Sequence, residues 1–272
     1  MKMAKRICPI RQYARQFARF AILPLALSWL VQPCVSSGQA ATSEPDKITD
    51  AIEHVKEGHF YPSHIEQIAE AHAVQAIPAL KDRFILSQEE DEKGKIAAAL
   101  VRLGEKDDTY WSYLVAQATA AINSDLPFPT AFDSQGRQIP GQVSPEFTAW
   151  IKAHNVAPEV ASRDAVFGLP GKLVLLGETG DARGVPLLRQ ALQSHNPMIV
   201  IMGAKGLAAA QDKDSIPLII EACKRSPGTV AIAESLVYFD DPRAQSAADT
   251  NLPRDFAKAI RERAAKGRNP FY

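Results

Sequence analysis

The sequence predicts an all-α protein in which antiparallel helix pairs stack into an α-solenoid, with one non-repeat insertion. Three observations lead to this fold class. Apolar residues recur at helical spacing, turn and proline signals separate the helices, and a two-helix unit repeats roughly every 30 residues. Each helix has an apolar face that it cannot bury alone, whereas neighbouring copies of the unit can bury it together.

The repeat is clearest when residues 173–188 are aligned with residues 206–219. Asp181 then meets Asp212 at an offset of 31 residues, and a Val-Pro pair meets an Ile-Pro pair. A third copy places Asp241 another 29 residues along the chain. This regularity predicts that the same structural unit recurs through the C-terminal half.

Two earlier segments match parts of the same unit. Residues 98–108 match its first half, and residues 73–80 match its second half. In the first helix the stripe Ile96, Leu100 and Leu103 is typical of the buried face of an amphipathic helix. The following turn carries an aspartate, which we expect to cap the second helix by accepting hydrogen bonds from its free N–H groups.

Prolines mark where the second helices begin. Pro78, Pro186 and Pro217 each follow a branched apolar residue shortly after a turn. Because proline is tolerated in the first turn of a helix and not in its interior, each of these helices is expected to start just upstream of its proline.

The combined pattern L-x-x-L-G-E-x-x-D-x-x-x-(V/I)-P-x-L resembles HEAT repeats, specifically the short bacterial type called phycobilisome-lyase HEAT-like repeats. The resemblance is good over residues 171–224, fair over 73–120 and 227–250, and absent over about 124–165. It implies an armadillo-like helical superhelix. It does not imply one activity, because such repeats occur in scaffolds, in adaptors and in a few enzymes.

The N-terminus has the layout of a secretory signal peptide. The first 19 residues hold six basic residues and no acid, an apolar run follows over 20–31, and small residues come next over 36–41. We expect cleavage after Ala40. The apolar run is shorter than the roughly 20 residues that span a bilayer, so no membrane span is expected in the mature chain. A lipoprotein signal ending at Cys34 and a mitochondrial transit peptide are the rival interpretations.

Removal of that segment changes the charge. The full chain has 31 basic and 31 acidic residues, and residues 41–272 keep 25 and 31 of them, a net charge of −6. A mildly acidic body gives no broad electrostatic reason to bind nucleic acid. Cys223 would remain as the single cysteine, with no partner for an intramolecular disulfide, and its helical spacing indicates a buried core residue more than a reactive thiol.

The repeat is interrupted by a segment rich in proline, glycine and aromatic residues. Residues 126–143 lack helical spacing, so they predict an ordered excursion or a short hairpin. Ser144 and Pro145 then predict a helix that reaches His154, with the serine as its cap.

The remaining helices follow from similar signals. Residues 45–57 and 62–71 look helical, and another helix is expected to begin near Pro158 or Ser162 and to end before Pro170. The chain is therefore divided into a signal peptide (1–40), N-terminal helical repeats (41–125), the insertion (126–143), C-terminal HEAT-like repeats (144–252), and a capping helix with a tail (253–272).

Catalytic motifs are missing from the sequence. It contains no Cys-x-x-Cys, His-Glu-x-x-His or Gly-x-Ser-x-Gly motif and no phosphate-binding glycine loop. His59, His64 and Glu66 lie close together in sequence, yet without a recognised ligand spacing. We therefore expect no catalytic residue, cofactor or metal, and keep a site assembled from scattered residues as the alternative.

Four aromatic residues in or beside the insertion are the candidates for partner binding: Phe128, Phe132, Phe147 and Trp150. Aromatic side chains are favoured anchors in interfaces, although the same rings could instead pin the insertion to the helices. The expected function is that of a secreted or periplasmic protein–protein interaction scaffold or adaptor for another exported or envelope protein. The alternative is an enzyme or metal-binding protein.

Overall fold

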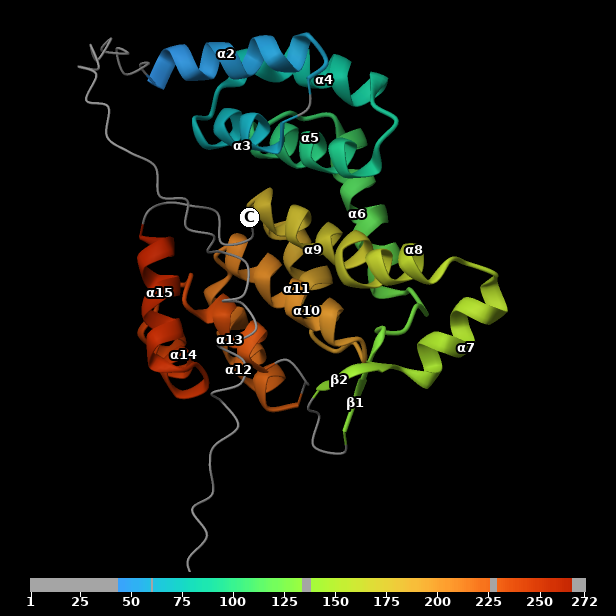
Figure 1. The fold of residues 1–272 in the computed structure, drawn as a ribbon. Coiled ribbons are helices and arrows are strands. Elements are labelled where there is room, and N and C mark those ends of the chain that lie inside the picture. Colours follow the sequence, from blue (N-terminus) through green and yellow to red (C-terminus); the bar gives the residue numbers. More distant parts are fainter. Residues whose placement is uncertain (1–43, 60, 134–137, 226–228, 266–272) are drawn as a thin grey trace, which may run out of the picture. The chain divides into compact units, whose positions relative to one another are not determined.

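The computed structural model describes residues 44–59, 61–133, 138–225 and 229–265, and these residues are mostly helical (Figure 1). The predicted all-α class is confirmed. The expected signal peptide, 1–40, and the expected C-terminal tail, 267–272, lie outside the described residues. Within the described part, no helix is long and apolar enough to cross a membrane.

The first half of the described chain is a succession of helices and one short 3₁₀ turn. They are α2 (Glu44–Lys56), α3 (Pro62–Glu70), η2 (Val74–Ala76), α4 (Ile77–Leu86), α5 (Glu90–Arg102) and α6 (Asp108–Ile122). A two-stranded antiparallel hairpin, β1 (Thr130–Phe132) and β2 (Gln138–Val143), follows α6. The hairpin predicted for the insertion is therefore present.

The second half is again helical. Its elements are α7 (Pro145–His154), α8 (Pro158–Arg163), the π-helical turn η3 (Asp164–Gly168), α9 (Leu169–Glu178), η4 (Ala182–Gly184), α10 (Val185–Ala191), α11 (Pro197–Ala209), η5 (Lys213–Ser215), α12 (Ile216–Arg225), α13 (Thr229–Leu236), α14 (Pro242–Asn251) and α15 (Arg254–Ala264). The helix expected from Pro253 is α15.

Most helices pack on a helix that is adjacent in the chain and on another that lies further away along the chain. One series of contacts runs α3 to α5, α5 to α9, α9 to α11 and α11 to α13, and each of these helices also contacts a flanking partner such as α2, α6, α10 or α12. The stripe residues predicted from spacing lie in the shared core: Ile96 and Leu100 are fully buried and Leu103 is 7% exposed.

The closest helix contact is between α9 and α11, which lie side by side in Figure 1. A Cβ atom added to Gly177 would lie 2.1 Å from the backbone oxygen of Gly206, and one added to Gly206 would lie 2.7 Å from the backbone oxygen of Leu173. Glycine at both positions lets the two backbones touch. These two glycines therefore serve helix packing.

Turn aspartates cap helices at three of the repeat positions. The carboxylates of Asp107, Asp181 and Asp241 accept hydrogen bonds from the backbone N–H two residues ahead. Asp212 differs, because its carboxylate pairs with Arg189 of α10 at 2.8 Å and accepts the hydroxyl of Ser215. The expected cap at Asp212 is replaced by a bridge from the turn before α12 to α10.

Pro170 does not end a helix, contrary to the sequence-based expectation. It is one of the first residues of α9, directly after the π turn η3, and the helical run continues from α8 through η3 into α9. A proline has no N–H to donate, and the wider bonding pattern of a π turn accommodates this loss within a helix. The run thus joins the insertion to the helices of the second half.

Candidate functional site

A large hollow lies where the hairpin meets the helices. A groove of about 840 Å³ is bordered by the end of α6, the hairpin, the start of α7 and the loop that precedes α11. Its walls include Phe128 and Phe132 on one side and Ser194, His195 and Asn196 on another. The groove thus combines the insertion with the ends of α6 and α7 and with a loop about 70 residues further along the chain.

The hairpin is shaped by an irregularity in its register. Thr130 pairs with Val143, while Phe132 pairs with Gln138, so β2 carries extra residues between these two pairs. Gly141 lies in this bulged stretch with φ +75°, a conformation that glycine adopts without strain. The bulge fixes how the hairpin leaves the helices and places Phe132 on the groove.

Ser144 anchors the hairpin to α7. Its backbone N–H donates to the carbonyl oxygen of Pro129 at 2.9 Å, and its hydroxyl oxygen accepts the backbone N–H of Phe147 at 3.2 Å, as predicted for a serine cap. The same hydroxyl donates to the carboxylate of Glu146 at 2.7 Å, and this hydrogen bond lowers the pKa of Glu146. Glu146 therefore stays ionised at the rim of the groove.

Two of the four predicted aromatic residues form an accessible pair. The rings of Phe128 and Phe132 stack with centroids 5.7 Å apart and an interplanar angle of 26°. Both side chains are half-buried and both line the groove. Since both rings are partly exposed and line the groove, they can contact an apolar group that enters it.

The other two aromatic residues hold the insertion in place. Phe147 is 2% exposed and packs in a small separate core with Leu126, Ala161 and Ala165. A ring buried to this extent is not available to a partner, so Phe147 belongs to the scaffold of the site and not to its surface.

Trp150 is half-buried at the edge of that small core. Its indole N–H donates to the carboxylate of Asp125 at 3.1 Å, and its ring stacks on His154 with centroids 4.1 Å apart. The bond to Asp125 ties α7 to the loop after α6, whereas the stack on His154 lies within α7. Phe147 is thus removed from the predicted partner surface, and Trp150, although half-buried like Phe128 and Phe132, does not line the groove.

Sequence reasoning missed the contribution of the loop before α11. The side chain of Asn196 caps α11 by accepting the backbone N–H of Met198 at 2.9 Å, and its amide group donates to the carbonyl oxygen of Leu126 at 3.4 Å. The Asn-Pro start of α11 signals a cap in the sequence. The bond to Leu126 joins residues 70 positions apart, and no local pattern reveals it.

The histidines considered as scattered ligands are not gathered as the sequence suggested. His59 is exposed and lies 3.4 Å from the carboxylate of Glu57. Glu66 borders a small cavity with Lys95, Arg102 and Glu178, to which no histidine contributes. Among the described residues, the group with metal-ligand geometry is instead Asp50, His54 and His64.

Comparison of the chain with models of protein families, with curated proteins and with solved structures finds no match.

Proposed function

We propose that this chain is an exported scaffold or adaptor, an α-solenoid of HEAT-like repeats that holds a segment of another exported or envelope protein in the groove at its insertion. The observation that carries the proposal is the half-buried, stacked pair Phe128–Phe132 on the wall of a groove of about 840 Å³. The secretory layout of residues 1–40 supports an exported location.

The packing order of the helices supports the solenoid. From α3 to α13, contacts connect each helix with a flanking partner and with the corresponding helix of the next unit. Polar contacts follow the same order: Arg189 bridges to Asp212, and the amine of Lys213 donates to the carbonyl oxygen of Asp240 at 2.8 Å. Contacts between nearest neighbours are typical of repeat proteins, which offer extended binding surfaces.

The chemistry of the groove indicates the kind of segment it holds. Its wall offers the two phenylalanine rings, whereas its rim carries the exposed carboxylates of Asp125 and Glu146. An apolar side chain flanked by lysine or arginine complements this arrangement, because the apolar group enters between ring and wall and the cation meets the acidic rim.

The test is a crosslinking pull-down from the envelope fraction with matched variants. Phe128→Ala and Phe132→Ala each remove half of the stacked pair, and we expect each to reduce the recovery of a specific partner by about tenfold or more, the usual effect of losing an interface anchor. Phe167→Ala is the control, because Phe167 is 70% exposed and is not part of the groove.

Two results would contradict the proposal. One is recovery of no specific partner by the unmodified chain. The other is equal recovery by the groove variants and the Phe167→Ala control. If the recovered partner is a second copy of the chain, sedimentation of the purified protein will show an oligomer that Phe132→Ala dissociates, and the scaffold is then one that assembles with itself.

A further inference from the structure

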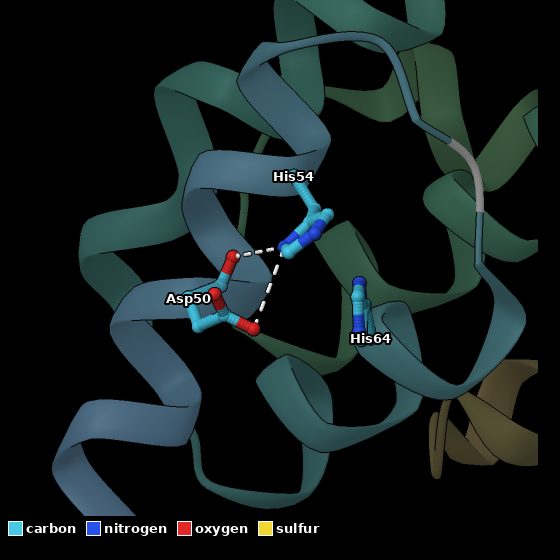
Figure 2. Close-up of side chains that lie close together, drawn as sticks. All are labelled: Asp50, His54 and His64. Carbon is cyan, nitrogen blue, oxygen red and sulfur yellow. Dashed lines mark hydrogen bonds and ion pairs between the residues drawn. The ribbon is translucent and has the colours of Figure 1, made fainter.

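Three side chains from the first two described helices converge at one place, away from the groove. Asp50 and His54 are four residues apart on α2, so they share one face of that helix, and His64 lies in the first turn of α3. One ligand atom from each residue lies within 4.8 Å of the others. Figure 2 shows the two imidazole rings and the carboxylate turned toward a common space between the helices.

The hydrogen bond of His54 determines which nitrogen is free to bind a ligand. Its Nδ1 lies 2.8 Å from the backbone oxygen of Asp50, and a carbonyl oxygen can only accept a hydrogen bond. Nδ1 of neutral His54 therefore carries the proton, and Nε2 carries the lone pair. Histidines that bind metal ions usually donate their other N–H to such an acceptor, which fixes the ring.

His64 supplies an independent sign that a partner is needed. Its Nδ1 is buried and has no hydrogen-bond partner. Leaving a buried polar atom unpaired costs free energy, and a bound cation at a ring nitrogen fixes the tautomer and adds a strong interaction in return. The ring lies 4.8 Å from the ring of His54, between centroids, so both can reach one ion.

We propose that Asp50, His54 and His64 bind a divalent transition-metal ion of the Zn²⁺ type. Two imidazoles and one carboxylate are a ligand set that Zn²⁺ accepts, with bonds of about 2.0–2.2 Å and a fourth position left for water or another side chain. Such bonds place ligand atoms about 3.3 Å apart. Because Nδ1 holds the His54 ring in place, the group that must rotate is the exposed Asp50 carboxylate, which lies 3.5 Å from that Nδ1.

The ion would join α2 to α3. These two helices already pack on each other, and the loop between them carries His59, whose ring centroid is 6.0 Å from that of His54. A ligand that binds the folded chain alone stabilises it, so the expected role is to hold the first helix pair together. This site is independent of the proposed function at the groove.

The experiment is calorimetric titration of Zn²⁺ into the chain, purified without a histidine tag and freed of metal. We expect one Zn²⁺ per chain from this site, a Zn²⁺-dependent rise in melting temperature, and at least a tenfold weaker Kd in both His54→Ala and His64→Ala. Co²⁺ in place of Zn²⁺ should give the visible absorption of a four-coordinate nitrogen and oxygen site, and both variants should lose it.

His72→Asn is the matched control. His72 is an exposed histidine beyond the end of α3 with φ 49°, and asparagine tolerates that left-handed conformation. Its Kd for Zn²⁺ should equal that of the unmodified chain. Because His64 is half-buried, circular dichroism must first show that His64→Ala is folded. If it is not folded, the Kd of His54→Ala for Zn²⁺ decides the test. Undetectable Zn²⁺ binding, or binding unchanged in His54→Ala, would overturn the proposal.

Discussion

At the scale of single residues, burial governs the chemistry of Cys223. The thiol lies in the core of α12 at 3% exposure, and burial raises its pKa to about 11 from an ordinary value of 9.0. The thiolate is the reactive form, so the native thiol is inert at neutral pH. The sequence-based interpretation of Cys223 as a core residue agrees with this placement.

We predict that iodoacetamide at pH 8 leaves Cys223 unmodified in the native chain and alkylates it once the chain is unfolded in guanidinium chloride. Mass spectrometry of the peptide that contains Cys223 measures both states. Rapid alkylation under native conditions would show that the thiol is accessible, contrary to its burial.

The same shift makes stability depend on alkaline pH. The folded state holds the thiol proton more tightly than the unfolded state does, so this contribution is complete below the ordinary pKa of 9.0 and is lost as pH rises toward about 11. Cys223→Ala removes this contribution, and its denaturation midpoint should fall less steeply over that interval.

The turn aspartates show what local sequence can predict at this scale. A cap uses a backbone N–H two residues away, as at Asp181 and Asp241, and its position follows from the pattern. The partner of Asp212 is Arg189 on α10, 23 residues earlier, and only the packing of the helices brings the two together. Local contacts are predictable because their geometry is fixed within one turn, whereas long-range contacts are not.

At the scale of elements, the contact between α9 and α11 depends on the absence of side chains. Gly177→Ala would place a methyl group 2.1 Å from the backbone of Gly206, and no side-chain rotation can relieve a clash with backbone. We expect a loss of stability of about 3 kcal/mol, the upper part of the range for overpacked cores, measured by equilibrium denaturation.

Gly171→Ala is the control on the same helix. Nothing lies within 4 Å of a Cβ atom added there, so the change should be neutral or stabilising by up to about 1 kcal/mol through better helix propensity. Equal effects of the two substitutions would mean that propensity, and not the close approach of the backbones, limits position 177.

Helix boundaries were predictable where a cap or a proline begins an element, as at Ser144 and Pro158. They were not predictable at Pro170, because the π turn before it is a product of packing and carries no local signature.

The candidate site likewise has one part that follows from local sequence and one part that does not. The hairpin follows from composition, whereas the groove arises when that hairpin meets a loop some 70 residues away, where Asn196 bonds to Leu126.

At the scale of the whole molecule, contacts between neighbouring helices predict that a destabilising substitution affects only the helices near it. Phe239 is 1% exposed between α13 and α14, and its truncation to alanine should cost about 3–5 kcal/mol. If the stability of this chain is a sum over neighbouring units, Phe239→Ala will accelerate amide hydrogen exchange in α12 to α15 and leave α3 and α5 nearly unchanged.

Uniform acceleration along the chain would instead show a single cooperative unit and would count against a solenoid. Hydrogen exchange followed by mass spectrometry distinguishes the two patterns.

The all-α class was predictable because the sequence carries helical spacing, turn and proline signals along most of its length. The cluster of Asp50, His54 and His64 was predictable only in part. The four-residue spacing places Asp50 and His54 on one face of a helix, but His64 joins them only through the packing of α2 on α3.

The π turn over residues 164–168 sets the rotational phase of the run that joins the insertion to the second half. Each residue of an α-helix advances the chain by about 100° around the axis. A π turn bonds each N–H one residue further back than an α turn does, so it holds one residue more than regular winding needs. Deleting one residue from this turn would therefore restore regular winding and leave Ala161 and the rest of α8 facing Leu126 and Phe147, whereas a deletion within α9 would rotate α8 by that angle. The turn thus marks the place in the run where a lost residue leaves the insertion aimed as before.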